Sequence, residues 1–504
     1  MNGRLSGASA SFSGNSGPEC AWEGNIRVGP ATPDLRSEDE RQAAPPVAVL
    51  DRAPFIALCL FLVLALLTGG GSRPDVLSHI ILRPAAVLFG AAAMLMMVDY
   101  RQLRAVRVPL FLLGALAAVM IVQLIPLPPS VWTALPGREL TTEAAGVFGI
   151  EQPWRPISLT PARTWNSLVS LFPPAAALLL YAALRPDYRA RILPVLLLLI
   201  VASAVLGLAQ RVGAPGGPLY LYRITNEGYA VGFFANRNHQ AVMLACALPM
   251  LAVYASQPAG SALSSRVRLG TAAAAGIFLI PLILATGSRA GLAAGLIGLL
   301  AAGLLFRRSG RPSSGRSAVR AIKPGLVIVG IAAILVFVTV FFGQADALYR
   351  MTLSGLANDP RATSFATSAE LARTSFPIGT GFGSFDSVYR AVEPMDSLAL
   401  SYLNHAHNDL LQLVIEAGAV GLLLLAAFLL WVGRRAFAAW RAPVRGSNSV
   451  MLARLASVIV AILLLASLAD YPLRTPFVMI VFALSLAWLG SSHGPGEAAR
   501  APAT

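Results

Sequence analysis

A pair of histidines precedes a long apolar stretch in the second half of the chain, in the sequence HAHNDLLQLVIEAGAVGLLLL. His405 and His407 supply imidazole rings, and Asn408 is a residue type that caps helix N-termini. A neutral imidazole can act as a general base toward a hydroxyl group. The positive end of a helix dipole favours the neutral ring of His407, although a structural role is the alternative for a histidine at such a boundary.

Three arginines also stand close to the starts of apolar stretches. Arg223 and Arg237 lie in YRITNEGYAVGFFANRNHQA, and Arg289 lies in ATGSRAG, with Asn238 and Ser288 as candidate helix caps. Helix N-termini favour anions, and a guanidinium can hold a phosphate with two hydrogen bonds. We therefore predict a site for the diphosphate of a lipid-linked donor. Arg223 and Arg237 compete for one role in it, and anchoring to lipid headgroups is the alternative for each arginine.

Ionisable residues inside predicted spans are costly and are usually functional or paired. Glu416 lies about two turns into one apolar stretch, and Asp470 ends another, where Arg474 is a candidate partner. His405 and His239 are interpreted as polar groups of a loop or of an acceptor site. No acidic cluster of the type that holds Mg²⁺ or Mn²⁺ stands out in the sequence, so we expect metal-independent chemistry without a cofactor.

The chain that positions these groups has 504 residues, of which 56% are hydrophobic and 12% are charged. This composition is typical of polytopic membrane proteins. Apolar runs of about 17 to 25 residues indicate membrane-spanning helices. We predict an all-α membrane protein with twelve transmembrane helices, near residues 54–70, 79–98, 108–127, 167–184, 192–210, 239–256, 269–286, 289–306, 325–342, 408–432, 450–468 and 475–490.

Basic residues mark the cytoplasmic loops of membrane proteins, and here they follow every even-numbered span. Both termini are therefore predicted to be cytoplasmic, and the net charge of +15 mostly reports this bias rather than a nucleic-acid partner. The loops predicted on the outer side cover about residues 128–166, 211–238 and 343–407. The candidate site residues at the helix starts share that outer side.

The ends of the chain differ in composition from its middle. Residues 1–52 are rich in Gly, Ser, Pro and Ala and are predicted to form a disordered cytoplasmic tail. Residues 53–490 form the predicted transmembrane domain, and residues 491–504 form a cytoplasmic C-terminal tail. The three cysteines, at positions 20, 59 and 246, do not predict a disulfide. The segment GTGFGS near residue 380 is interpreted as a tight turn, not as a dinucleotide-binding loop.

Four segments, in this order, resemble the O-antigen ligase and polymerase superfamily of bacterial envelope glycosyltransferases. GFFANRNHQA resembles a Gly-Phe-Asn-x-Asn segment of the family, with Arg237 where many members carry proline. TGSRAG resembles a Ser-Arg-Gly step, with Ala290 in place of the commoner glycine, and FPIGTGFGSF resembles a glycine-rich loop. His407 and Asn408, then nine residues, Gly418, two residues and Gly421 resemble the ligase motif. The resemblance covers about residues 53–490, in which SLTPARTW and LADYPLRTP also look familial.

The resemblance implies transfer of a glycan from an undecaprenyl-diphosphate carrier to an acceptor hydroxyl. The reaction would take place on the periplasmic face of the bacterial inner membrane, with membrane lipids around the protein. His407 would be the base, and Arg289 with Arg223 or Arg237, together with Asn238, would bind the diphosphate leaving group. Asn408, His405, His239, Glu416 and Asp470 would support the site. We expect inversion at the anomeric carbon, because direct displacement needs no protein nucleophile.

The acceptor separates the members of this superfamily, and the motifs leave it open. A ligase uses lipid A-core, a polymerase uses another lipid-linked repeat unit, and a protein transferase uses a Ser or Thr hydroxyl. We favour a ligase or a polymerase over a protein O-oligosaccharyltransferase. Outside this class, a polysaccharide or lipid transporter and a structural assembly partner are the alternatives. The clustering of polar groups at the outer boundary, rather than at the midplane, argues against a transporter.

Overall fold

The computed structural model of this chain describes residues 51–258, 261–307, 360–395, 398, 403–443 and 448–491. The predicted span at 325–342 and nearly all of the predicted tails lie outside these residues. The elements in chain order are α2 (Ala53–Thr68), α3 (His79–Met96), η2 (Tyr100–Ala105), α4 (Arg107–Gln123), β1 (Pro126–Leu127), α5 (Pro129–Trp132), α6 (Glu139–Val147), β2 (Arg155–Pro156), α7 (Pro161–Val169), α8 (Phe172–Ala183), α9 (Pro186–Arg189), α10 (Ile192–Val212), α11 (Arg237–Ser256), α12 (Ala262–Ala285), α13 (Arg289–Leu305), α16 (Pro360–Ser375), α17 (Phe385–Val392), α18 (Asp409–Arg441), α19 (Asn448–Ala466), η6 (Pro472–Arg474) and α20 (Pro476–Ser491).

Seven helical segments among the described residues are long and apolar enough to cross a membrane. They are His79–Met96, Pro161–Ala183, Pro186–Val212, Arg237–Ser256, Leu263–Ala285, Asp409–Arg441 and Asn448–Ala466. Four shorter apolar helices, α2, α4, α13 and α20, lie where four further spans were predicted. A helical membrane protein is therefore confirmed, whereas the count of twelve spans stays a prediction.

Helix α11 lies at the centre of the main core, and nearly all of its side chains are buried. It packs most closely against α13, where added Cβ atoms on Gly291 and Gly298 would overlap Ala241 and Ala245 of α11. Small residues let two helix backbones approach in this way inside membranes. The close packing places the N-termini of α11 and α13, which carry two of the candidate arginines, in one region.

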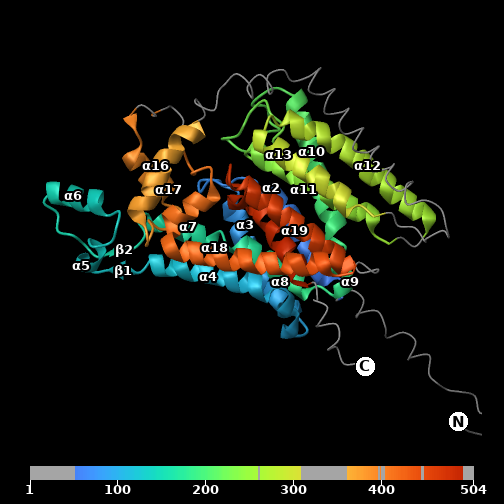
Figure 1. Cartoon of the computed structure of the whole chain (residues 1–504), viewed down its shortest axis with the longest axis horizontal. Coiled ribbons are helices and arrows are strands. Elements are labelled where there is room, and N and C mark those ends of the chain that lie inside the picture. The colour runs from blue at the N-terminus through green and yellow to red at the C-terminus, as the bar shows by residue number, and fades with distance from the viewer. Residues whose placement is uncertain are drawn as a thin grey trace, which may run out of the picture. The chain divides into compact units, whose positions relative to one another are not determined.

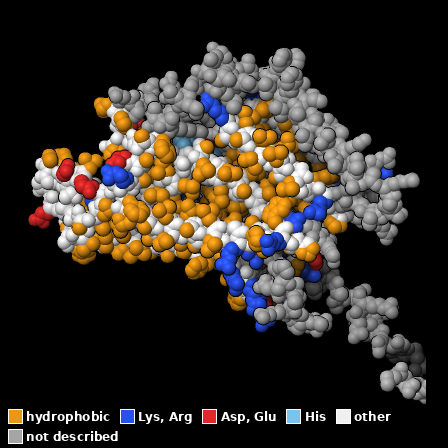
Figure 2. Space-filling view, viewed as in Figure 1, with side chains coloured by type: hydrophobic (Ala, Val, Ile, Leu, Met, Phe, Trp, Pro, Cys, Tyr) orange, Lys and Arg blue, Asp and Glu red, His pale blue; other side chains and the backbone are white. Residues whose placement is uncertain are grey.

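The surface of the described unit fits a lipid environment. Figure 1 shows the group formed by α10 to α13, and α18 beside α4, with which it is in contact. In Figure 2, hydrophobic side chains cover most of the visible described surface, and basic side chains gather along its lower edge. Many large apolar side chains are exposed along the helices, for example Leu88, Leu198 and Leu423. Lipid chains could cover such side chains, and the helices satisfy their own backbone polar groups.

The predicted outer loops contain regular structure where they are described. The first includes α5, α6 and a short antiparallel pair in which Pro126 faces Pro156 and Leu127 faces Arg155. The predicted span at 167–184 is interrupted, since α7 ends at Val169 and α8 begins at Phe172 with two prolines in its first turn. Proline lacks an N–H group but is tolerated in a first turn, so a second helix starts there. The described part of the loop at 343–407 contains α16 and α17.

Helix α18 is broken at Gly418, whose φ of 53° and ψ of −137° are rarely accessible to a residue with a Cβ atom. The close neighbour of this glycine is the glycine-rich loop. An added Cβ would overlap the carbonyl group of Pro377. The N–H group of Ala419 donates a hydrogen bond of 2.9 Å to that same carbonyl.

The glycine-rich loop satisfies backbone groups at this break. Thr380 and Gly381 donate hydrogen bonds of 2.9 and 3.0 Å to the carbonyl oxygens of Ile415 and Glu416. Gly381, like Gly379 and Gly383, has a positive φ, so the predicted tight turn is confirmed. Because buried carbonyl groups need partners, the loop and the broken helix stabilise each other.

Two long polar side chains also donate hydrogen bonds to the glycine-rich loop and to the broken helix. The amide of Gln123, at the end of α4, donates to the Glu416 carbonyl at 2.9 Å and accepts from the Phe382 N–H at 3.0 Å. Arg138 is fully buried and donates to the carbonyl oxygens of Ile157 and Gly379. Burial lowers the pKa of Arg138 to about 10. The loop is thus fixed by hydrogen bonds that come from three separate segments.

Replacing Gly418 by alanine tests whether the break depends on the glycine conformation. We expect Gly418→Ala to destabilise the fold by about 1 to 3 kcal/mol, because the residue is held in a strained conformation for a Cβ-bearing side chain. The midpoint of thermal unfolding of the purified protein measures this change. Gly433→Ala is the matched control in the same helix, since a Cβ there meets nothing within 4 Å. A Gly418→Ala protein as stable as the Gly433→Ala protein would contradict the analysis.

Candidate functional site

His407 lies just before α18, and a carboxylate binds its ring. Its Nδ1 atom is 3.0 Å from Oδ1 of Asp470, and the two side chains are 17% and 3% exposed. A carboxylate accepts hydrogen bonds, so Nδ1 carries a proton, and Nε2 is the nitrogen that has a lone pair whenever the ring is neutral. His407 is also the one residue other than glycine with a positive φ, 51°, among the described residues. Backbone strain of this kind is concentrated at functional sites.

Asp470 joins this histidine to the central helix of the core. Its second oxygen, Oδ2, accepts a hydrogen bond of 2.5 Å from the side-chain amide of Asn238 in α11. Asp470 itself lies between α19 and η6. One buried carboxylate therefore fixes the position of the His407 ring relative to α11.

The other two predicted histidines meet His407 at a single tyrosine. The ring centroid of Tyr471 lies 4.3 Å from that of His405, 4.9 Å from that of His407 and 5.3 Å from that of His239. His239 is buried, and its Nδ1 atom is 2.8 Å from the Thr475 hydroxyl. The structure thus brings all three histidines together around one aromatic ring.

Arg237 directs its side chain toward the connection between α12 and α13. Its guanidinium carbon lies 4.1 Å from the centroid of the Tyr229 ring. A Cβ on Gly287 would lie 3.4 Å from Arg237 Nη1, and Arg289 follows two residues after that glycine. Consecutive residues at the start of α11 therefore face two parts of the candidate site, since Asn238 binds Asp470 and Arg237 reaches the turn that carries Arg289.

The other two arginine predictions have different outcomes. The turn before α13 is tight, and the Arg289 side chain that follows it is exposed. A side chain at the first position of a helix can project outward because only the backbone there is constrained by the turn. The Arg223 side chain is 87% exposed and lies 3.9 Å from Asp75.

Two of the three predicted helix caps are confirmed. The Asn408 side chain accepts hydrogen bonds from the N–H groups of Leu410 and Leu411, and Ser288 accepts from Gly291. Asn238 does not cap α11. Asn236 does so by accepting from the N–H group two residues later, which leaves the Asn238 amide available for Asp470.

A second charged network joins the first turns of α18 to η6. Arg474 donates through Nε to Asp409 at 3.0 Å and through Nη2 to Glu416 at 3.2 Å. The sequence suggested Asp470 as the partner of Arg474, whereas the structure places these two acids of α18 against it. Glu416 is fully buried and also accepts a hydrogen bond of 2.7 Å from Gln412. The buried carboxylate is therefore both paired and hydrogen-bonded, as its burial requires.

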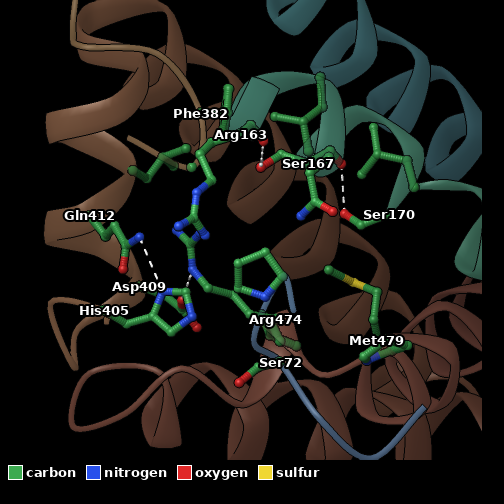
Figure 3. Close-up of a pocket in the computed structure, with 18 of the residues that line it drawn as sticks. Ser72, Arg163, Ser167, Ser170, Phe382, His405, Asp409, Gln412, Arg474 and Met479 are labelled. Atoms are coloured by element: carbon green, nitrogen blue, oxygen red, sulfur yellow. Dashed lines mark hydrogen bonds and ion pairs between the residues drawn. The ribbon is translucent and has the colours of Figure 1, made fainter. Parts of the chain in front are cut away.

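His405 faces a cavity of about 480 Å³ that Asp409, Gln412 and Arg474 also line (Figure 3). The Gln412 amide oxygen accepts from the Ala406 N–H, so its nitrogen is the atom that lies 3.3 Å from His405 Nδ1. Burial, and then the charge of Arg474, hold the pKa of His405 well below its usual range. The neutral ring accepts at Nδ1 and carries its proton on Nε2. His407 and the candidate arginines of α11 and α13 do not line this cavity.

No group of three or more His, Cys, Asp or Glu side chains within the described ranges is placed to hold a metal ion. Metal-independent chemistry stays a prediction.

Several site residues were not predicted from the sequence. Tyr471 and Gln412 carry no charge, and the contacts that give them a role join residues far apart in the chain. Tyr471 does lie in LADYPLRTP, which looked familial, so that segment was the available signal. Asp409 follows the cap residue directly and was not singled out from the sequence.

A protein family model matches part of the chain. Residues 273–426 match the family model described as O-Antigen ligase, which supports the resemblance to the O-antigen ligase and polymerase superfamily. The matched segment includes Arg289, the glycine-rich loop and His407, whereas Arg237 and Asp470 lie outside it. At a coarse level the family points to a membrane glycosyltransferase of the ligase or polymerase type. No curated protein matches the chain.

The low pKa of His405 predicts a dependence of stability on pH. The unfolded chain protonates this residue below about pH 6.5, whereas the folded protein holds it neutral. Stability is therefore fully present above that value and falls as the pH decreases below it. Thermal unfolding midpoints measured across this range should fall less steeply for His405→Asn than for the unmodified protein. Equal slopes for the two proteins would show that His405 is not held neutral.

Proposed function

We propose that this protein is a membrane glycosyltransferase that moves a glycan from an undecaprenyl-diphosphate carrier to an acceptor hydroxyl. The contact between His407 and Asp470 is the observation that carries the proposal. In the reaction, the acceptor oxygen attacks the anomeric carbon, and the bond from that carbon to the diphosphate oxygen breaks. The hydroxyl proton passes to His407 Nε2, and the lipid diphosphate leaves. A single displacement of this kind inverts the anomeric configuration.

The structure supports His407 as the base because Asp470 accepts from Nδ1 and leaves Nε2 able to receive a proton. The carboxylate also stabilises the imidazolium that forms, as in other histidine and carboxylate pairs. Asn238 is a positioning residue in this proposal, because it holds Asp470 and not the diphosphate.

Arg237 is favoured over Arg223 as the partner of Arg289 at the diphosphate. Arg237 lies against the turn that begins α13, whereas Arg223 is almost fully exposed and faces Asp75. Two guanidinium groups at helix N-termini would neutralise the charge that develops on the leaving diphosphate. The exposure of Arg289 fits this role, since a residue that binds a substrate must be accessible.

We place the reaction at the periplasmic face of the inner membrane, with both termini in the cytoplasm. The acceptor is proposed to be a glycan or lipid A-core, as for a ligase or a polymerase. A protein O-oligosaccharyltransferase is the second candidate, since its acceptor is also a hydroxyl group. The transporter alternative gains no support from the structure, because the described histidines and arginines of the site gather at helix starts.

Reconstitution with a lipid-diphosphate glycan and a set of acceptors tests this function. His407→Ala should lower turnover by about 10² to 10⁴, the usual contribution of a general base. His407→Ala also removes a partner of the buried Asp470 carboxylate, so the thermal unfolding midpoint is measured beside turnover to show that the variant is folded. Unchanged turnover by this variant would exclude the mechanism.

The arginine assignment has its own test in the same assay. Arg237→Ala and Arg289→Ala should each lower turnover by at least about tenfold, since each removes a charge-assisted contact to the leaving group. Arg223→Ala is the matched control and should retain most of the activity. A larger loss for Arg223→Ala than for Arg237→Ala would reverse the assignment. Turnover should survive EDTA, and product analysis by NMR should show an inverted linkage.

A further inference from the structure

The cavity of about 480 Å³ beside His405 has walls of two kinds. Polar side chains line one part, among them His79 and Arg83 of α3, Arg163 of α7, His405 before α18 and Arg474 of η6. Figure 3 shows Arg163, His405 and Arg474. Large apolar side chains of α18, α19 and α20 line another part, including Leu413, Phe428, Leu464 and Met479. A cavity with a charged part and an apolar part suits a molecule that has a polar group on a hydrocarbon chain.

The carboxylates that line this cavity are already bound to arginines. Asp75 is 3.0 Å from Arg73. Asp386 is 3.6 Å from Arg163, and Asp409 is 3.0 Å from Arg474. The acidic residues of the cavity are thus neutralised without any contribution from the fourth arginine that lines it.

That fourth arginine is Arg83, in α3. Its Nη1 atom donates a hydrogen bond of 2.8 Å to Asn166 in α7, and no carboxylate within the described ranges lies within ion-pair distance of it. The residue is half-buried in a helix long and apolar enough to span a membrane. A cation in this position without an acid is costly and indicates a bound anion.

Two buried ring nitrogens add a second observation. His79, one turn before Arg83 on α3, is 5% exposed and places Nε2 at 3.1 Å from the Gly71 carbonyl. Its Nδ1 atom is buried without a partner among the described residues, as is Nε2 of His405. Both histidines line the cavity. Buried polar atoms of this kind normally have a partner, so a ligand with hydrogen-bonding groups is expected there.

We propose that this cavity binds a lipid with an anionic, phosphate-type group at Arg83 and its hydrocarbon chain along the apolar wall. Arg83 supplies the charge, His405 donates from Nε2, and His79 accepts from a hydroxyl group at Nδ1. The site is separate from the turn that carries Arg289, and it ends at His405, whose ring and that of His407 both contact Tyr471. The ligand is either the lipid-linked acceptor, which rests on the proposed function, or an anionic phospholipid of the membrane.

Binding of an alkyl phosphate to the full-length protein in phosphatidylcholine nanodiscs tests the site. Dodecyl phosphate should displace a fluorescent alkyl phosphate, and uncharged dodecyl maltoside should not. Arg83→Gln should weaken the phosphate by at least about tenfold, the loss expected for one charge-assisted contact. Arg211→Gln removes an equal charge from an exposed position in the last turn of α10 and should bind as the unmodified protein does.

A second variant tests the cavity without removing a charge. Ser170→Trp keeps every charge but places bulk in the cavity, and it should also weaken binding. Equal affinity for the phosphate and the uncharged detergent, or unchanged binding by both variants, would overturn the proposal. His407→Ala should bind the alkyl phosphate normally. The binding proposal can therefore be contradicted while the proposed function is supported, and the proposed function can be contradicted while the binding proposal is supported.

The source of the lipid is decided by turnover in nanodiscs with and without phosphatidylglycerol. If the lipid is the acceptor, Arg83→Gln raises the KM for the acceptor and leaves the KM for the donor unchanged. If it is a phospholipid, both KM values stay constant, and phosphatidylglycerol raises the unfolding midpoint of the unmodified protein but not of Arg83→Gln. Either result supports the site and identifies its occupant.

Discussion

The carboxylate of Asp470 connects the parts of the molecule on which the candidate site depends. One of its oxygens receives the ring of His407, and the other receives the amide of Asn238 at the start of the most buried helix. A buried carboxylate is costly unless its oxygens are hydrogen-bonded, so both contacts stabilise Asp470 in this position. The same requirement holds the histidine in one orientation and one tautomer. Arg237, next to Asn238, is positioned by the same helix start.

A similar constraint shapes the backbone around the site. Helix α18 cannot continue regularly through Gly418, and the carbonyl groups near the break are buried away from water. The glycine-rich loop supplies N–H groups to these carbonyls, and Gln123 supplies a further donor from α4. Because a buried polar group without a partner costs free energy, the loop, the break and the end of α4 form one interdependent unit. This unit sets the direction from which the start of α18 presents His407.

The arginines inside this apolar protein differ in whether a carboxylate of the protein pairs with them. Arg474 is surrounded by Asp409 and Glu416, so it is explained by internal pairing and stabilises the start of α18 against η6. Arg289 is accessible at a helix N-terminus, where an anion binds favourably. Arg83 lies in a membrane-type helix with only an amide as its described partner. The contrast between Arg474 and Arg83 separates a cation that is paired inside the protein from one for which we propose a ligand.

The sequence alone determined the class of the protein, because apolar runs and helix-capping residues are local properties. It singled out His407 and Arg289 as candidates, and it predicted the tight turn near residue 380 and the positions of eleven apolar helices that the structure describes. Only the tertiary structure decided which polar groups meet. Asp470 pairs with Asn238, which is 232 positions away, and Arg474 pairs with Asp409 and Glu416. These pairings depend on helix packing, which short sequence patterns do not encode. Burial likewise comes from packing, so Arg289 could be located in the chain but not placed at the surface until the helices were assembled.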